Sequence, residues 1–352
     1  MKLYTFLILA TGAAMVITVK SDLFPIPPEK PGASSGTVRL DAPPLELAVQ
    51  SSEVQTGTST IPTFPRYISL PSQDVGAPTG ALPAGTAPGP GTTGQEGLEE
   101  YQLLGLGIRT VSFLGIQVYV VGLYVALPDI ATLQERLIRT VDPVATTLVP
   151  AERSKLYDLL HDPSKSEEIW SSIIKSGNIR TAIRIVPTRN TDFGHLRDGW
   201  LRGITGKTQI ANANGSTEFL DDAFGQSVSE FKTIFGGTNK GKVPKGETLL
   251  LLRNKKGELQ AYHEEIKTLK SKSSDTPSDQ LPPPPPSQKQ TKKTKIQRSF
   301  LGEVKDERIS RLLLLLYLGG KNVSSEGARD SVVDGCLELV ERPVGTVEAQ
   351  VV

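Results

Sequence analysis

The chain has few of the residues that build covalent or metal-based sites. It contains one cysteine, Cys336, and three histidines. A single cysteine excludes an intrachain disulfide, and none of the histidines has a second ligand at metal spacing. We therefore expect no metal site. His195, in the sequence DFGHLRDGW, is more typical of a surface or capping residue on a helix than of a catalytic base.

An excess of charge of one sign is also absent. The sequence has 39 basic and 38 acidic residues, which gives a net charge of +1. This balance offers no electrostatic reason to expect nucleic acid as a partner. The length of 352 residues would allow two domains. The composition instead favours one compact domain that carries a long tail and an insert.

Long apolar runs are missing except at the N-terminus. The run from Leu3 to Val19 is close to the roughly 20 residues that span a bilayer. It could be an uncleaved membrane anchor over residues 1–21 or the core of a secretory signal peptide. Cleavage after Gly12-Ala13-Ala14 would leave a very short core and release an apolar N-terminus. We therefore favour the anchor.

Two segments have the composition of chains that do not fold by themselves. Residues 22–96 are rich in Pro, Gly, Ser and Thr, and we expect a disordered linker. Within that range, Ile61 to Ser72 mixes β-formers with prolines and could dock as an edge strand. Residues 270–295 contain five consecutive prolines and the basic run QKQTKKTK. We expect an exposed insert whose charges make it soluble or touch an anionic membrane or protein.

The remaining region, residues 97–345, has the pattern of an α+β domain. Leu103 to Val125 reads as a β-hairpin that breaks near Leu114-Gly115. A second hairpin turns at Asn254-Lys255-Lys256-Gly257. Strands in pairs and helices in runs predict an antiparallel sheet packed against a layer of helices. The other predicted strands are Arg180 to Val186 and Ile296 to Val304, and the predicted helices are Pro128 to Arg139, Glu152 to His161, Ser166 to Ser176, Asp192 to Ala211, Thr217 to Phe235, Asp306 to Leu318 and Ser325 to Val340.

Arg109 is the only fully charged residue in the first hairpin. A guanidinium does not lose its proton in proteins, so its burial in an apolar hairpin requires an anionic partner. The partner could be a carboxylate of the protein, which would make Arg109 structural. It could also be the carboxylate or phenolate of a ligand, which would make Arg109 functional.

The register of the hairpin decides what lies beside Arg109. A three-residue loop centred on Leu114 places Arg109 opposite Tyr119, whereas a two-residue loop pairs it with Val120. An arginine beside a phenol in apolar surroundings suits an amphipathic anion such as a fatty acid, a polyphenol or a porphyrin propionate. Otherwise Tyr119 is an ordinary packed strand residue.

The hairpin carries the spacing Gly105-x-Gly107-x-Arg109, and the second strand ends Gly122-x-Tyr124. In these residues the chain resembles the chalcone isomerase superfamily, and more loosely the likeness extends from about Leu98 to Val340. It is most similar to a fungal branch, the altered-inheritance-of-mitochondria proteins. The resemblance implies an open-faced sandwich fold and a single-pass anchor in the mitochondrial inner membrane, although no Arg-rich presequence precedes the apolar segment.

The resemblance also implies roles for particular residues. The plant arginine that matches Arg109 orients an anionic substrate, and Tyr119 stands where plant enzymes have a threonine. Phe193 and Trp200 match a catalytic Tyr and Asn on a helix, and Leu316 matches a later Thr. None of these three has the polar group that cyclisation needs. We therefore expect a non-catalytic domain that binds a fatty acid, or haem, through these five residues.

Two other functions stay open at this stage. The first is an intramolecular lyase acting on a chalcone-like enone with a different polar set, drawn from Thr110, Thr188, Asn190 or His195. The second is a structural protein with a vestigial pocket. A pocket filled by Trp200 and Phe193 would favour the structural role.

Overall fold

The computed structural model describes residues 4–10, 13–19, 52–72, 97–112, 114–236, 241–268, 294–342 and 344. These residues belong to two separate units, Met1–Gln50 and Ser51–Val352. In the first unit, β1 (Tyr4–Ala10) pairs antiparallel with β2 (Ala13–Val19). This hairpin covers most of the predicted anchor. Among the described residues, no helix has both the length and the apolar character needed to cross a membrane.

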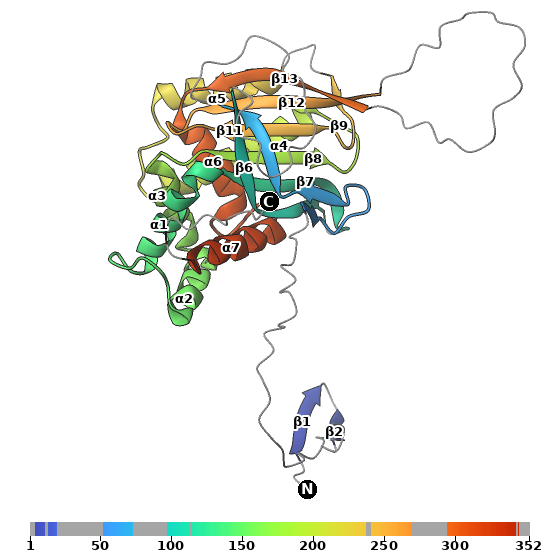
Figure 1. Ribbon diagram of the computed structural model, residues 1–352, viewed down its shortest axis with the longest axis vertical. Coiled ribbons are helices and arrows are strands. Elements are labelled where there is room, and N and C mark those ends of the chain that lie inside the picture. The colour runs from blue at the N-terminus through green and yellow to red at the C-terminus, as the bar shows by residue number, and fades with distance from the viewer. Residues whose placement is uncertain are drawn as a thin grey trace, which may run out of the picture. The chain divides into compact units, whose positions relative to one another are not determined.

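The second unit is built on a seven-stranded antiparallel sheet in the order β13-β12-β11-β8-β7-β6-β5 (Figure 1). Both predicted hairpins are present, as β6–β7 and β11–β12. The strands of this sheet are β5 (Tyr67–Pro71), β6 (Leu98–Val111), β7 (Ile116–Ala126), β8 (Thr181–Pro187), β11 (Thr248–Arg253), β12 (Leu259–Thr268) and β13 (Thr294–Val304).

Helices cover one face of this sheet and confirm the predicted α+β class. The main core lies between them, because inward residues of the strands meet the apolar side of each helix. A short 3₁₀ turn, η1 (Leu127–Asp129), precedes the first helix. The helices are α1 (Ile130–Val141), α2 (Pro150–His161), α3 (Ser166–Lys175), α4 (Phe193–Ala213), α5 (Asp222–Gly236), α6 (Glu307–Leu318) and α7 (Glu326–Val340).

The other face of the sheet carries a second, smaller core under residues 52–72. Phe64 is completely buried there, with the guanidinium of Arg184 4.3 Å from the centre of its ring, and it follows the short strand β3 (Glu53–Gln55) along the chain. Phe64 itself belongs to β4 (Thr63–Pro65), which pairs with β3. The edge strand expected within Ile61 to Ser72 is therefore present, inside the range of the predicted linker.

The glycines of β6 allow helix α7 to approach the strand closely. A Cβ at Gly105 would lie 2.3 Å from the backbone nitrogen of Val332, and one at Gly107 would lie 2.3 Å from that of Ala328. No side chain fits into such a contact, so glycine is required at both positions. This contact fixes the N-terminal end of α7 beside the strand that carries Arg109.

Candidate functional site

The structure places Arg109 opposite Tyr119, as one of the two predicted registers requires. The loop is longer than the prediction assumed, because Val111 pairs with Ile116 and four residues lie between them. A β-bulge then shifts the register between Arg109 and Thr110. One extra residue on the β7 side restores the pairing and turns both side chains to the same face of the sheet.

Arg109 is half-buried, and its charge has no neutralising partner among the residues that the structure describes. Its Nη1 donates a hydrogen bond to the backbone carbonyl of Ser324, at 2.9 Å. No carboxylate of the described residues forms an ion pair with it. Ser324 lies just before α7, and the neighbouring Ser325 caps that helix and donates to the carbonyl of Ile108. Within the described ranges, the acceptor beside Arg109 is therefore a neutral carbonyl.

Tyr119 is buried at the point where β7, α4 and α6 meet. Its hydroxyl lies 2.8 Å from the hydroxyl of Tyr317 on α6. The indole Nε1 of Trp200 on α4 donates to the same Tyr317 hydroxyl oxygen, at 3.2 Å. Three side chains from three elements thus form one hydrogen-bonded chain, which we call the tyrosine chain.

The tyrosine chain contains one more donor than the described residues can satisfy. Trp200 and the two tyrosines supply three protons, one each. Only two contacts join them, so one hydroxyl proton has no protein acceptor in either arrangement. A buried donor without an acceptor costs about 1–3 kcal/mol. The tyrosine chain therefore has one hydroxyl proton with which it can donate a hydrogen bond to an oxygen outside the protein.

Both hydroxyls keep their protons near neutral pH. Burial, reinforced by the neighbouring Tyr317, raises the pKa of Tyr119 well above its ordinary value, although the charge of Arg109 opposes this shift. Burial also raises the pKa of Tyr317, against the opposing effects of its hydrogen bonds and of Arg109. A protonated hydroxyl is a hydrogen-bond donor, so the spare proton of the tyrosine chain is available on the same face of the sheet as the positive charge of Arg109.

The three residues assigned through the family resemblance lie in different surroundings. Trp200 belongs to the tyrosine chain. Phe193 begins α4 and packs against Phe235 and the edge of His263, with ring centroids 6.4 and 5.1 Å apart. Leu316 is buried against α4, where a Cβ at Gly203 would lie 2.6 Å from its Cδ2.

Tyr317 is the residue that the sequence analysis missed. Leu316 has no polar group, but Tyr317, the next residue of α6, has a hydroxyl. Its only signal is that Tyr317 is the one residue with a hydroxyl in the apolar run LLLLLYL. Every residue of that run is buried, so the pattern alone does not say which side chain faces β7.

The alternative polar residues lie elsewhere. Thr110 and His195 are exposed. The hydroxyl of Thr188 donates to the carbonyl of Gln117, at 3.0 Å, and the side-chain oxygen of Asn190 accepts from the backbone of Lys245. None of these side chains has a hydrogen bond to the tyrosine chain.

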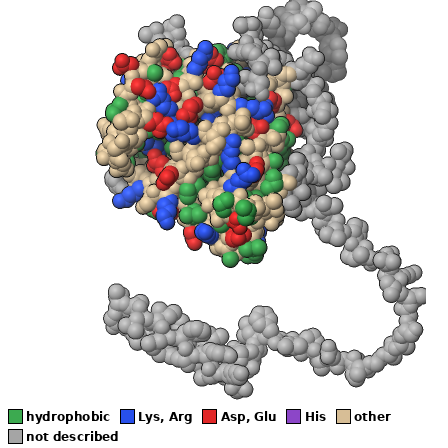
Figure 2. Space-filling model, turned by 90° about the vertical axis from the view of Figure 1, so that its left-hand side faces the viewer, with side chains coloured by type: hydrophobic (Ala, Val, Ile, Leu, Met, Phe, Trp, Pro, Cys, Tyr) green, Lys and Arg blue, Asp and Glu red, His purple; other side chains and the backbone are tan. Residues whose placement is uncertain are grey.

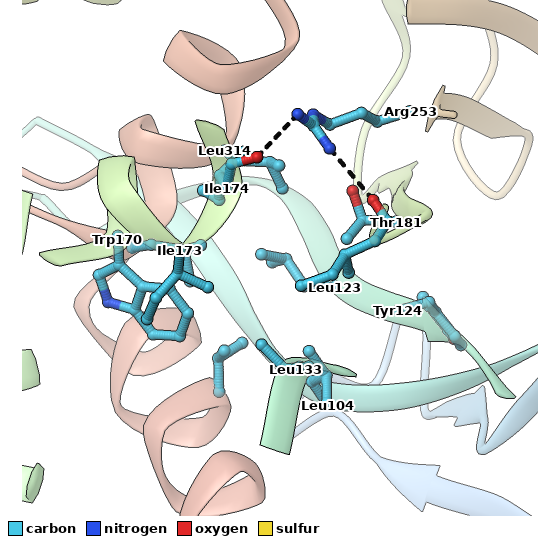
Figure 3. Close-up of a pocket in the computed structure, with 13 residues that line it drawn as sticks. Leu104, Leu123, Tyr124, Leu133, Trp170, Ile173, Ile174, Thr181, Arg253 and Leu314 are labelled. Atoms are coloured by element: carbon cyan, nitrogen blue, oxygen red, sulfur yellow. Dashed lines mark hydrogen bonds between the residues drawn. The ribbon is translucent and has the colours of Figure 1, made fainter. Parts of the chain in front are cut away.

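An apolar cavity of about 30 Å³ lies between the sheet and helices α1, α3, α6 and α7 (Figure 3). Leu104 and Leu123 line it from the sheet, and Trp170 and Leu314 from the helices. Arg253 also lines the cavity and donates to the backbone carbonyls of Ile179 and Ile174, and dashed lines mark these hydrogen bonds. This volume holds only about one or two water molecules. Arg109 and Tyr119 are not part of its lining.

Sequence comparison gives one family for most of the second unit. Residues 99–333 match the family described as chalcone isomerase like. A protein named Altered inheritance of mitochondria protein 18, mitochondrial, from Debaryomyces hansenii is 31% identical over 240 residues, which are 68% of this chain and 67% of that protein. The protein of the same name from Eremothecium gossypii is 31% identical over 244 residues, with the same coverage.

Structural comparison finds a crystal structure described as an Arabidopsis thaliana fatty-acid binding protein. It is 18% identical, has a TM-score of 0.43, and covers 78% of this chain and all of that one.

Proposed function

The chain belongs to the chalcone isomerase-like family, and we propose that its domain binds an amphipathic anion without catalysing isomerisation. The carboxylate of the ligand accepts hydrogen bonds from Arg109 and from the tyrosine chain. The observation that carries this proposal is that two neighbouring hydrogen-bond donors lack acceptors. An arginine with no carboxylate partner in the described parts of the chain lies opposite a buried chain of hydroxyls with one proton to spare.

One carboxylate can accept hydrogen bonds from both Arg109 and the tyrosine chain. Its two oxygens carry about four acceptor sites, so it can bridge a guanidinium and a hydroxyl. Hydrogen bonds to a charged partner contribute about 1.5–3 kcal/mol each. The anion must displace or share the contact of Arg109 with Ser324, which is a bond to a neutral carbonyl and therefore weaker.

The apolar part of the ligand belongs between the sheet and the helices. Tyr119, Val121 and Leu123 follow one another on the helix-covered face of β7, and Leu123 borders the apolar cavity. A single flexible alkyl chain can enter this layer if leucine side chains change rotamer. We do not propose haem, because a rigid macrocycle is many times larger than the cavity of about 30 Å³ and, unlike a flexible alkyl chain, cannot thread between side chains that change rotamer. We therefore propose a single-chain fatty acid as the ligand class.

Catalysis of ring closure has less support than binding, because the positions that the family resemblance assigns to catalysis add no free donor to the spare hydroxyl proton of the tyrosine chain. Addition of a phenolate to an enone needs oriented water and donors to the developing enolate. Phe193 offers no polar atom, and the indole N–H of Trp200 is already used within the tyrosine chain.

Extraction of bound ligand tests the proposal directly. Wild type, Arg109→Ala and the control Arg139→Ala are purified in parallel, denatured and analysed by mass spectrometry. Arg139 is exposed on α1 and pairs with Glu135. We expect the same amphipathic carboxylate in wild type and control, and at least a tenfold loss in Arg109→Ala, because about 1.5 kcal/mol corresponds to roughly tenfold. Equal retention by all three proteins would refute the role of Arg109.

One observation favours a second function, a structural role with a closed pocket. Trp200 packs against Phe231 and Phe235, and Phe193 stacks on Phe235, so aromatic side chains occupy the space near the tyrosine chain. A structural protein predicts no bound carboxylate in any of the three preparations.

We also propose a mitochondrial location, with residues 1–21 holding the protein at the inner membrane. The printed names of the relatives support the organelle. The apolar run from Leu3 to Val19 supports the attachment. In isolated mitochondria, the wild type should resist extraction with alkaline carbonate, whereas Leu7→Glu with Ile17→Glu should be released. Release of both proteins would contradict the attachment.

A further inference from the structure

Helix α7 lies beside a part of β6 that has a strand on one side only. Strand β5 pairs with the first part of β6, and residues 105–111 pair, within the described ranges, with β7 alone. The backbone groups of these residues that point away from β7 need partners from another element. On α7, the hydroxyl of Ser331 accepts a hydrogen bond from the backbone nitrogen of Leu106, at 3.1 Å. Ser325, which precedes α7, donates to the carbonyl of Ile108, at 2.9 Å.

The hydroxyl of Ser325 joins the start of the helix to the strand. Its oxygen accepts a hydrogen bond from the backbone nitrogen of Ala328, at 3.2 Å, and so caps α7. A capping side chain acts only as an acceptor. The cap therefore does not explain the second bond, in which the hydroxyl donates to Ile108. Both bonds are shielded from water, because Ser325 is only 5% exposed.

The bond from Ser325 fixes the peptide unit that leads into Arg109. The carbonyl carbon of Ile108 is bonded to the backbone nitrogen of Arg109, and the peptide unit is planar. The direction of the Ile108 carbonyl therefore sets the position of the Arg109 Cα. A β-bulge follows directly, between Arg109 and Thr110, and a bulge disrupts the ladder of hydrogen bonds near it. A contact from outside the ladder is thus well placed to define this peptide.

The residue before Ser325 holds the other end of the arginine. The Nη1 atom of Arg109 donates to the carbonyl of Ser324, at 2.9 Å. Because Ser324 and Ser325 are consecutive, one dipeptide contacts both the backbone beside Arg109 and its guanidinium group. A shift of this dipeptide would move the guanidinium group relative to Tyr119, whose hydroxyl is bonded to Tyr317.

The surface charge does not replace this local positioning. On the face of the molecule seen in Figure 2, side chains of both signs are interspersed. The fields of mixed exposed charges are also screened by salt within about 10 Å. Selection of an anion then depends on where the guanidinium group of Arg109 lies.

We propose that Ser325 is a positioning residue for anion binding. Its bond to Ile108 holds Arg109 where the guanidinium group and the tyrosine chain can bind one carboxylate. This inference rests on the proposed binding of a fatty acid at Arg109. Ser325 acts through Arg109 and does not touch the ligand, so it affects recognition of the carboxylate and not of the alkyl chain.

The ratio of the affinities for a long-chain fatty acid and for the alcohol with the same alkyl chain measures this recognition. A general loosening of the domain weakens both ligands and leaves the ratio unchanged. Ser325→Ala should lower the ratio about three- to tenfold, the effect of one hydrogen bond. Ser325→Thr keeps the hydroxyl and should restore the ratio. Calorimetric titration of the full chain measures both affinities, and circular dichroism checks that each variant is folded.

Two controls separate positioning from a structural effect. Ser331→Ala also removes a hydrogen bond between α7 and β6, but at Leu106, farther from Arg109 along the strand. It should keep the wild-type ratio. The second control adds Ser325→Ala to Arg109→Ala, and the ratio should then not change further, because a residue that acts through Arg109 has no effect without it.

Three results would overturn the proposal while leaving the proposed function intact. The first is a wild-type ratio in Ser325→Ala. The second is an equal loss in Ser331→Ala, which would assign the effect to loosening of α7. The third is a further fall of the ratio when Ser325→Ala is added to Arg109→Ala. A wild type that does not prefer the acid would refute the proposed function and this inference with it.

Discussion

Two arginines in or beside the same sheet differ in their charged partners among the described residues: Arg180 is paired with carboxylates and Arg109 is not. Arg180, the residue before β8, is buried and donates to Asp129 through Nε at 2.7 Å and through Nη2 at 3.0 Å, and to Glu99 through Nη1 at 2.5 Å. These carboxylates raise its pKa further above the ordinary value. Arg109 is half-buried, and its Nη1 donates to the backbone carbonyl of Ser324. A charge that serves only the fold is neutralised internally, whereas no carboxylate of the described residues pairs with Arg109, and we propose that an external anion does.

The largest difference between the two sites should be seen in stability. Asp129→Ala leaves the buried guanidinium of Arg180 with fewer acceptors and should lower the free energy of unfolding by about 3–5 kcal/mol. Urea denaturation of the full chain measures this change. Glu135→Ala, which breaks the exposed pair with Arg139, is the control and should cost less than about 1 kcal/mol.

Arg109 should show the reverse pattern. Arg109→Ala removes one hydrogen bond to a carbonyl, so it should cost at most about 1.5 kcal/mol of stability. It should weaken binding of a long-chain fatty acid roughly 10- to 100-fold, which corresponds to about 1.5–3 kcal/mol. Calorimetric titration measures the affinity. A loss of stability as large as that of Asp129→Ala, with unchanged affinity, would make Arg109 structural.

The sequence predicted the hairpin and left Tyr119 and Val120 as the two possible partners of Arg109, because alternating residues fix the faces of a strand but not the length of the loop. It could not predict the loop length and the β-bulge that place Arg109 opposite Tyr119. The loop has four residues, and a bulge beside Arg109 restores the register. A bulge depends on how the strand packs on its neighbours, which a local pattern does not contain.

The site on α6 could not be read from the sequence for a different reason. Successive helix residues point about 100° apart, so an alignment error of one position exchanges Leu316 for Tyr317. Both are buried in the run Leu312 to Leu318, in which every residue is buried and only Tyr317 carries a polar group. Only the packing of α6 against β7 and α4 shows that the hydroxyl of Tyr317 meets Tyr119 and Trp200.

The two tyrosines of the chain should differ in their effect on stability. Tyr317→Phe removes the acceptor of Trp200 and the partner of Tyr119, which leaves two buried donors unpaired and should cost about 1–3 kcal/mol. Tyr119→Phe keeps the bond between Trp200 and Tyr317 and should cost less than about 1 kcal/mol. Thermal unfolding compares the two variants. Equal losses would contradict the donor count.

The smallest effect should be a dependence on alkaline pH. The folded protein keeps the proton of Tyr119 beyond the pH at which an unfolded tyrosine loses it, near about 10. Stability therefore falls as pH rises above that value, by about 1 kcal/mol per tyrosine between pH 10 and 11. Urea denaturation at pH 9, 10 and 11 should show a smaller decrease for Tyr119→Phe. The control Tyr157→Phe changes an exposed tyrosine and should match wild type.

The most direct test of the account is a binding cycle between Arg109 and the carboxylate of the ligand. The affinities of a long-chain fatty acid and of the alcohol with the same alkyl chain are measured for wild type and for Arg109→Ala. We predict that wild type prefers the acid at least tenfold and that this preference disappears in Arg109→Ala. An equal preference for the acid in both proteins would contradict the claim that Arg109 is held ready for an anion.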